Sequence, residues 1–408
     1  MNCDTLFSCW TFPSSGPFRR FFTGNIPNPL GYGGGVPVQI CEEIAVIFLF
    51  CIVFVIAAYG ARLRHPVDSA TGFLTRDFCD AVKGICILLV FIRHVWPYIE
   101  IAGYVSPPVI ARMGSVVNGA IGQLLVAPFL FFSGFGVMES VLSKGDAYVR
   151  AMPKRRLLPT ALNFDIAVLL FAALAVSLGQ QVSVNRLLSA LVGWSDVGNS
   201  NWYIFDIVVL YALFWVSFSF WGVSGRNSLG AKTDMRRSRI LFPIASVTLL
   251  SSFLAVALWF SGKSGFWYNT ILCFPAGVCF SFLSPLLLKQ TTSPARFRKI
   301  LIVFALAFCV AHALSRKVPP LCGNVGAVLF SLLVALLSAK LCIGNRALRW
   351  LGRNLFPLYI YHWIPMIAFS HIDGGHFAAS HPFLFVMACL VSTFAIANAY
   401  PRFSIRFK

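Results

Sequence analysis

Long apolar runs are the feature that most restricts how this chain can fold. Stretches of roughly 20 mostly hydrophobic residues recur along it, and each is long enough to cross the hydrocarbon core of a bilayer as a helix. A helix also bonds its own backbone polar groups, as a lipid environment demands. The sequence therefore predicts an all-α, polytopic transmembrane helical bundle of about eleven spans, at 42–60, 81–99, 117–139, 160–180, 202–222, 240–260, 267–287, 298–315, 323–341, 354–371 and 383–400.

The composition excludes an ordinary soluble domain. Hydrophobic residues make up 58% of the 408 residues and charged residues only 12%. A soluble domain carries about 25% charged residues, which cover its core with a polar shell. The apolar runs here are continuous and do not alternate with polar residues, so helices are favoured over a transmembrane β-barrel.

The positive charge is explained by topology. Lysine and arginine number 33 against 14 acidic residues, for a net charge of +19. They gather in every second loop, at 62–76, 144–156, 226–239, 289–299 and 340–353, and again at the C-terminus. Basic loops remain on the cytoplasmic side of a membrane. This pattern predicts an exterior N-terminus and a cytoplasmic C-terminus, and it requires no nucleic-acid partner.

The second apolar run carries the most informative ionisable residues. Lys83 stands near its start, and Arg93 and His94 lie near its end. Eleven helical steps separate Lys83 from His94, about 16 Å along the axis, and bring both to nearly the same helix face. Ionisable groups within the membrane are costly and are therefore functional candidates.

Each of these residues also has a structural explanation. A neutral His94 can accept a proton from a hydroxyl, or carry an acyl group transiently, but it can equally pack against a neighbouring helix. Lys83 alone fits the positive-inside pattern. Arg93 either belongs to the site from a second helix face or extends to the membrane interface. His362, in a later run, either lines the site or bonds another helix.

Five motifs in a fixed order resemble the acyltransferase-3 family of bacterial integral-membrane O-acyltransferases. The first is the basic residue, ten intervening residues and histidine of Lys83 to His94. The others are a Phe-rich Ser-Gly-Phe helix, a basic segment ending in Leu-Pro, a Trp-led helix with an acidic residue, and a Tyr-x-x-His-Trp helix, at 128–136, 154–159, 201–206 and 351–363. The resemblance covers about residues 76 to 400.

This resemblance implies a fold and an activity. The expected regions are an exterior irregular segment at 1–40, an extra N-terminal span with its cytoplasmic loop at 41–75, and a ten-helix acyltransferase domain at 76–408. The expected reaction moves an acyl group, normally acetyl, from acyl-CoA to a hydroxyl of a cell-surface polysaccharide, glycolipid or lipid-linked glycan. Acyl-CoA is then a co-substrate, no tightly bound cofactor is needed, and the expected location is the cell (inner) membrane.

The resemblance also suggests roles for single residues. The catalytic candidates are His94 as base, Lys83 as an orienting or phosphate-facing cation and Asp206 as a polarising group. Acyl-CoA binding is expected at Lys154, Arg155, Arg156 and Ser133, although the positive-inside rule explains the three cations equally well and close helix packing explains the Ser133-Gly134 pair. The acceptor is expected to meet Arg93, Trp202, Tyr359 and His362.

Some features depart from the family pattern, and other functions compete with it. Lys83 stands where arginine is commoner, and Pro153 interrupts an Arg-x-x-Arg pattern. A transporter or flippase for a glycan, lipid or organic anion is the main alternative, but two halves with matching broken spans are not evident. A scaffold protein would leave the intramembrane charges without a purpose. The histidines at 371, 376 and 381 do not have the spacing of a zinc site, so no metal is expected.

Overall fold

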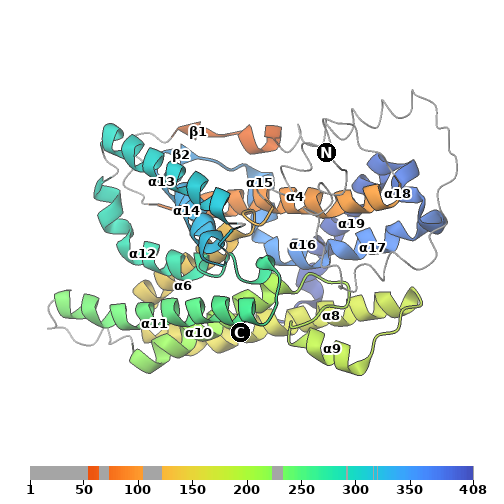
Figure 1. The fold of residues 1–408 in the computed structure, drawn as a ribbon, viewed down its shortest axis with the longest axis horizontal. Helices are drawn as coiled ribbons and strands as arrows, with labels where there is room; N and C mark the ends of the chain where they lie inside the picture. Colours follow the sequence, from red (N-terminus) through yellow and green to blue (C-terminus); the bar gives the residue numbers. More distant parts are fainter. Residues whose placement is uncertain are drawn as a thin grey trace.

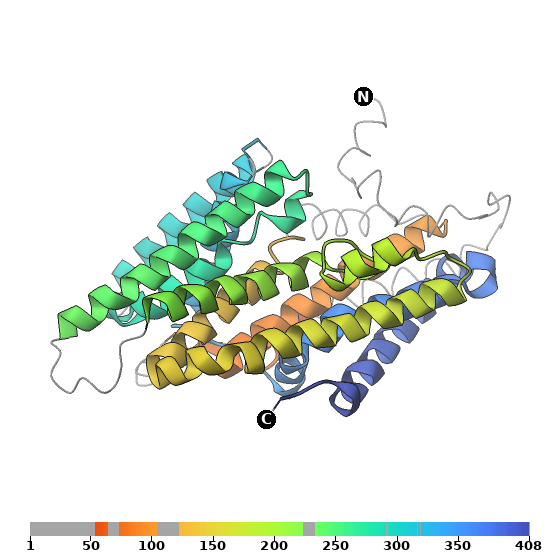
Figure 2. The same ribbon diagram turned by 90° about the horizontal axis from the view of Figure 1, so that it is seen from below.

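The computed structural model describes residues 54–63, 73–103, 122–222, 233–290, 293–315, 317–318 and 320–407. The predicted exterior segment at 1–40 lies outside these residues, as does most of the first predicted span. The described chain is a bundle of helices (Figures 1 and 2). The longer helices are α4 (Arg76–Ile101), α6 (Ala127–Lys144), α8 (Leu158–Ser177), α10 (Trp202–Trp221), α11 (Thr233–Phe260), α12 (Cys273–Gln290), α13 (Pro294–Leu314), α14 (Leu321–Leu337) and α19 (Pro382–Phe403).

Shorter elements connect or extend these helices. A π-helical turn, η3 (Pro153–Leu157), joins α7 (Asp146–Met152) to α8 in one continuous helix. The remaining short helices are α9 (Val184–Leu191), η4 (Gly265–Trp267), α15 (Arg346–Arg353), α16 (Leu355–Tyr361), α17 (Trp363–Ser370), η5 (Ile372–Gly375) and α18 (Phe377–Ser380).

Five of the described helical stretches are long and apolar enough to cross a membrane. They are Asp146–Ser177, Trp202–Trp221, Ile240–Phe260, Pro294–Leu314 and Pro382–Phe403. Only 11% of the apolar window of Pro294–Leu314 is buried within the protein, so lipid is the natural environment of its exposed leucines, valines and isoleucines. The fold is therefore that of a helical membrane protein.

Several predicted spans differ from the observed helices at their ends. In the predicted span at 117–139, residues 122–126 form turns before α6 begins at Ala127, and in the one at 267–287 the α-helix begins only at Cys273. The predicted span at 354–371 is interrupted at His362, which separates α16 from α17. Pro365 contributes to this interruption, because it has no N–H to give to the carbonyl one turn earlier.

A two-residue antiparallel ladder is a small exception to the helical fold. β1 (Arg62–Leu63) pairs with β2 (Leu341–Cys342), and the Asn345 side chain donates to the Ile56 carbonyl over 2.8 Å. Together these contacts attach the segment before α4 to the loop that leads into α15. The sequence does not alternate here, so nothing in its pattern predicted strands.

Two helix pairs approach so closely that only glycine fits between them. A Cβ atom at Gly84 of α4 would overlap the Leu348 carbonyl oxygen, and one at Gly352 of α15 would overlap the Asp80 carbonyl oxygen. Gly134 of α6 and Gly277 of α12 are in the same position against each other's helix. Small residues let helix backbones pack closely where lipid removes the hydrophobic driving force. The first pair fixes α4, drawn in orange in Figure 1, beside α15 from the far end of the sequence.

Candidate active site

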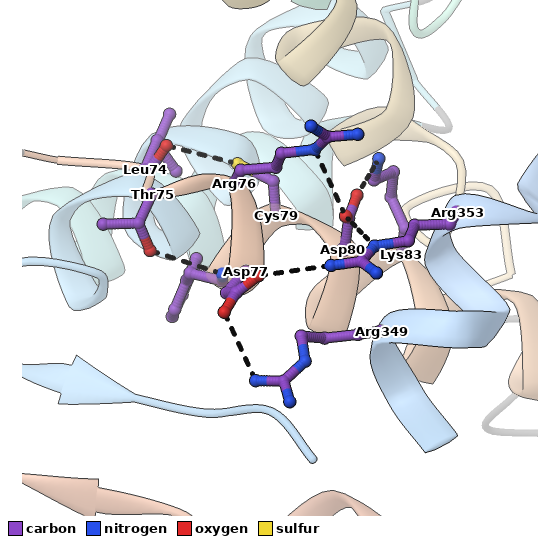
Figure 3. A network of polar contacts seen from close by, with 10 residues as sticks. Leu74, Thr75, Arg76, Asp77, Cys79, Asp80, Lys83, Arg349 and Arg353 are labelled. Atoms are coloured by element: carbon purple, nitrogen blue, oxygen red, sulfur yellow. Dashed lines mark hydrogen bonds and ion pairs between the residues drawn. The ribbon is translucent and has the colours of Figure 1, made fainter. Parts of the chain in front are cut away.

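The beginning of α4 holds a cluster of charges shared with α15 (Figure 3). The Lys83 ammonium lies 2.7 Å from one carboxylate oxygen of Asp80, and the Arg353 guanidinium lies 3.4 Å from the other. Arg353 also reaches Asp77 at 3.6 Å, and Arg349 lies 3.3 Å from Asp77. We call Asp77, Asp80, Lys83, Arg349 and Arg353 the charged cluster. It joins α4 to α15 by ionic contacts at the same place as the glycine contacts.

The two acidic residues of the charged cluster differ in their exposure. The Asp80 side chain is 5% exposed, whereas that of Asp77 is 58% exposed. Water screens the ion pairs of Asp77, which therefore contribute little to stability. Asp80 needs its cations, because an unpaired carboxylate at that depth is costly. Lys83 is thus engaged by Asp80, a residue three positions earlier to which the sequence analysis gave no role.

Further along α4, two histidines face each other. The Nδ1 atom of His94 lies 2.8 Å from the Nε2 atom of His362. His362 is buried, with 1% of its surface exposed, while His94 is only partly buried. The Nδ1 atom of His362 lies 3.0 Å from the Leu358 carbonyl oxygen, one turn earlier in α16. We call His94 and His362 the histidine pair.

Aromatic rings surround the histidine pair. The Trp363 ring centroid lies 4.6 Å from that of His94, and the Phe91 and Tyr359 rings lie 6.4 Å and 6.2 Å from that of His362. No carboxylate hydrogen-bonds or ion-pairs with either histidine in the described part of the chain. The site is thus an apolar one with two imidazoles at its centre.

Arg93 connects this site to the loop before α12. Its guanidinium lies 5.3 Å from the centroid of the Phe266 ring, and that ring lies 6.3 Å from the ring of Trp202 at the start of α10. Arg93 also interacts electrostatically with Tyr359. Three of the predicted acceptor-side residues therefore gather on the side of the histidine pair where α10 begins.

Tyr359 and Asp206 belong to a connected group of polar and aromatic residues next to the histidine pair. The Tyr359 hydroxyl is 2.9 Å from the Ser200 hydroxyl, and its ring is 4.9 Å from that of Tyr203. Asp206 is fully buried, and its carboxyl oxygens have no hydrogen-bond partner among the described residues. Its electrostatic neighbours are Tyr203 and Tyr359, and no contact joins it to His94 in that part of the chain.

The comparison with protein families identifies the chain. A family model described as an acyltransferase domain matches residues 76–399. The protein belongs to the acyltransferase-3 family. The searches of curated proteins and of solved structures gave no significant match. The family match confirms the predicted resemblance over nearly the stretch from which it was inferred, and it makes the protein a membrane acyltransferase.

The basic segment predicted to bind acyl-CoA lies elsewhere in this acyltransferase. Lys154, Arg155 and Arg156 are exposed and occupy the π-helical turn η3. Arg156 is directed toward the hydroxyl groups of Tyr148 and Tyr211, its main electrostatic partners. π turns are rare and concentrate at functional sites. The Pro153 that breaks the family's Arg-x-x-Arg pattern is the first residue of this turn.

Ser133 belongs to the closely packed pair α6 and α12. Its neighbour Gly134 meets the Phe274 backbone, so close packing accounts for that glycine, whereas Gly136 has nothing within 4 Å of an added Cβ atom. On the same helix, Glu139 accepts a hydrogen bond from Ser281 of α12 over 2.7 Å. Gly136 is thus the glycine of this helix that is not needed for packing.

Loops at the start of α10 form a second polar and aromatic group in the acyltransferase. The Lys263 ammonium lies 3.8 Å and 4.1 Å from the Trp194 and Trp267 ring centroids, and it donates to the Trp194 carbonyl. Desolvation lowers the pKa of Lys263. Burial raises the pKa of the Asp196 carboxyl, although Arg186 lies 3.6 Å away and opposes the shift. These contacts connect the loops that carry Trp202 and Phe266.

The structure thus brings together some predicted site residues and separates others. His94, His362, Arg93, Tyr359 and Trp202 lie around one site, with Asp206 reached through Tyr359. Lys83 is about 16 Å from His94 along α4, so the two cannot act on the same atom. Sequence reasoning did not single out Asp80, Arg349, Arg353, Ser200 or Phe266. Opposite charges three residues apart at Asp80 and Lys83 were the available signal for the first of these. No group of three or more potential metal ligands occurs among the described residues.

Proposed function

We propose that this acyltransferase transfers an acyl group, normally acetyl, from acyl-CoA to a hydroxyl of a cell-surface polysaccharide, glycolipid or lipid-linked glycan. It works in the cell (inner) membrane with its N-terminus outside and its C-terminus in the cytoplasm. Acyl-CoA is a co-substrate, and no cofactor is bound tightly. The observation that carries the proposal is a partly exposed histidine, His94, held at 2.8 Å by a buried second histidine in a chain of this family.

His94 serves as the general base. Its imidazole removes the proton of the acceptor hydroxyl while that oxygen attacks the thioester carbonyl. The carbon–sulfur bond then breaks, and the leaving thiolate takes the proton from His94. Proton transfer by a positioned side chain contributes about 10²- to 10⁴-fold to such a rate. The apolar surroundings of the histidine pair keep imidazole in the neutral, proton-accepting form that a base requires.

The cationic residues are assigned to the donor. Lys154, Arg155 and Arg156 are exposed in the π-helical turn, where they can pair with the phosphates of coenzyme A. Ser133 is assigned to the path of the thioester arm along α6. Lys83 contributes positive charge at the beginning of α4 and holds Asp80. Lys83 and His94 lie about 16 Å apart along α4, so a donor that approaches both must be extended.

The aromatic and polar residues on the other side are assigned to the acceptor. Arg93, Trp202 and Tyr359 supply the planar faces and hydrogen-bond donors that suit a sugar. His362 holds His94 in place through the contact between their ring nitrogens. Asp206 acts on this group through its electrostatic interaction with Tyr359. The chemistry suits a hydroxylated acceptor.

Transfer of radiolabel from acetyl-CoA in membranes tests the proposal. Wild type, His94→Gln and His312→Gln are compared at matched expression. His312 lies in the apolar helix α13 and serves as the control for losing an intramembrane histidine. Label should enter a glycan or lipid-linked fraction with wild type and His312→Gln, but not with His94→Gln.

Two results would contradict the proposal in different ways. Equal labelling with His94→Gln would remove His94 from the mechanism but leave acyl transfer intact. The absence of label in all samples, with other acyl donors and the native glycans supplied, would favour a transporter. Uptake of the candidate glycan or acyl donor into vesicles would then be the measurement to make.

A further inference from the structure

The histidine pair is joined edge to edge. The two imidazole planes differ by 6°, their centroids are 5.0 Å apart, and the facing nitrogens are 2.8 Å apart. Rings stacked face to face would not bring two ring nitrogens into line in this way. The geometry is that of an N–H group on one ring directed at the in-plane lone pair of the other.

The Leu358 carbonyl decides which nitrogen carries the proton. A carbonyl oxygen can only accept, so the Nδ1 atom of His362, 3.0 Å away, must be the donor. In a neutral imidazole the other nitrogen is then an acceptor. The Nε2 atom of His362 therefore accepts, and the Nδ1 atom of His94 must donate to it.

A doubly protonated His362 is the only arrangement that would reverse this order. It would place a cation in a ring that is 1% exposed. The groups that face His362 are the Leu358 carbonyl, His94 and the rings of Phe91, Tyr359 and Trp363, none of which is an anion. A buried charge without a counter-ion is strongly unfavourable. Both histidines are thus neutral, with their protons on Nδ1.

We infer that His362 is a positioning residue that fixes His94 in the Nδ1–H tautomer and so directs an unprotonated Nε2 atom toward the substrate. Within the described part of the chain this Nε2 atom has no hydrogen-bond partner. It is also not one of the buried polar atoms left without a partner, so it is accessible. His94 is also the more exposed of the two rings. The inference rests on the proposed function for the role of that nitrogen, but the tautomer itself does not.

The arrangement also suits the proton transfer. When Nε2 of His94 takes the hydroxyl proton, the O–H bond breaks and an N–H bond forms, and His94 becomes an imidazolium. Its Nδ1–H group still donates to His362, now as a stronger, charge-assisted hydrogen bond. His362 gains and loses no proton. His94 returns to its neutral form when the thiolate leaving group is protonated.

The tautomer can be measured directly. Full-length protein with ¹⁵N-labelled histidine in lipid nanodiscs gives separate NMR shifts for protonated and unprotonated ring nitrogens, and His94→Gln identifies the His94 signals. We expect a protonated Nδ1 and an unprotonated Nε2 for His94. A wild-type His94 with its proton on Nε2 would overturn the inference, whatever the activity.

Two substitutions separate positioning from packing. His362→Phe keeps a ring of similar shape but removes the acceptor, whereas His362→Gln removes the ring and keeps an acceptor. We expect His362→Phe to move the His94 proton toward Nε2 and to lower kcat for transfer about 100-fold or more, with the KM for acetyl-CoA unchanged. His362→Gln should retain the Nδ1–H signal and most of the activity.

The outcomes separate this inference from the proposed function. An active His362→Phe with an inactive His362→Gln would show that the ring matters for packing only, and it would overturn the inference. The expected tautomer in a wild-type protein that transfers no acyl group would support the positioning role while rejecting the proposed reaction.

Discussion

The two ends of α4 use polar residues in opposite ways. At its beginning, the charged cluster joins full charges in ion pairs with α15, several of them exposed to water. Farther along, the histidine pair joins neutral rings within apolar surroundings. Both carboxylates of the charged cluster are engaged by cations, whereas in the histidine pair the Nε2 atom of His94 has no hydrogen-bond partner among the described residues. Polar residues in the same helix therefore attach it to a neighbour in one place and, in the proposed function, serve chemistry in the other.

The comparison shows why an ionisable residue in an apolar helix is not by itself catalytic. Lys83 and His94 share a helix face, and both were candidates on that ground. The lysine is 2.7 Å from Asp80, which accounts for its presence without a substrate. Among the described residues, the histidine is held by a hydrogen bond at Nδ1 only. We expect substitutions at the two ends to separate stability from activity.

The largest effect is expected at His94. His94→Gln removes the proposed base and should lower kcat for transfer by about 10²- to 10⁴-fold. The KM for the donor and the midpoint of thermal unfolding should remain close to those of wild type, because no buried charge is left unpaired. Transfer kinetics and thermal unfolding in detergent measure both. A large drop in the unfolding midpoint would mean that the histidine pair also serves attachment.

The next effect is expected where α4 and α15 meet through glycine. Gly352→Ala places a methyl group against the Asp80 carbonyl oxygen, and neither backbone can move freely. We expect the free energy of unfolding to fall by about 3 kcal/mol, at the upper end of ordinary overpacking. Gly136→Ala is the control, since nothing lies within 4 Å of the added atom, and it should be neutral or slightly stabilising. Equal effects at the two glycines would argue against the close contact.

A smaller loss of stability is expected within the charged cluster. Asp80→Asn leaves Lys83 and Arg353 without their buried anion and should cost about 2 kcal/mol of unfolding free energy. Asp77→Asn is the matched control, because its side chain is 58% exposed and its ion pairs are worth at most about 1 kcal/mol. Chemical denaturation of the purified protein checks both values. If the order were reversed, the exposed pairs and not the buried one would hold α4 to α15.

The smallest effect is expected at Lys83. Lys83→Met removes one of the cations at Asp80, but Arg353 remains, so stability should fall by only about 1 kcal/mol. The KM for acetyl-CoA should rise less than about threefold, which corresponds to well under 1 kcal/mol of binding. A tenfold rise without a change in stability would instead mean that Lys83 contacts the donor, and the contrast between the two ends of α4 would no longer hold.

The sequence predicted helices well because their signal is local. Apolar runs of span length and the ordered motifs were sufficient for the helical membrane fold and for the family, which the family match confirms. Helix ends were less predictable: the apolar run before Ala127 gives no sign that its last residues form turns. The break at His362 lies inside an uninterrupted apolar stretch, and Pro365 was its only local sign.

Contacts between distant segments could not be predicted. The sequence shows that His94 and His362 are both within apolar runs, but not that α4 and α16 lie side by side with those rings in one plane. Likewise, Arg349 and Arg353 fitted the pattern of basic cytoplasmic loops. That pattern does not indicate which carboxylates they contact. Lys154, Arg155 and Arg156 gave no sign of a π turn, since such a turn depends on how the helix packs against other elements, here α10.

That π turn changes which residues of α8 lie on which face of the helix. The N–H of Leu158 bonds to the Pro153 carbonyl, five residues earlier, so the turn holds one residue more than an α-helical turn. The extra residue offsets the side chains after it by about 100° from the positions that an unbroken α-helix would give them. A helical wheel drawn straight through Asp146–Ser177 would therefore assign the wrong residues of α8 to the lipid. Deleting one residue between 153 and 157 would rotate the whole of α8 about its axis, which makes this short segment the one that sets the orientation of the helix.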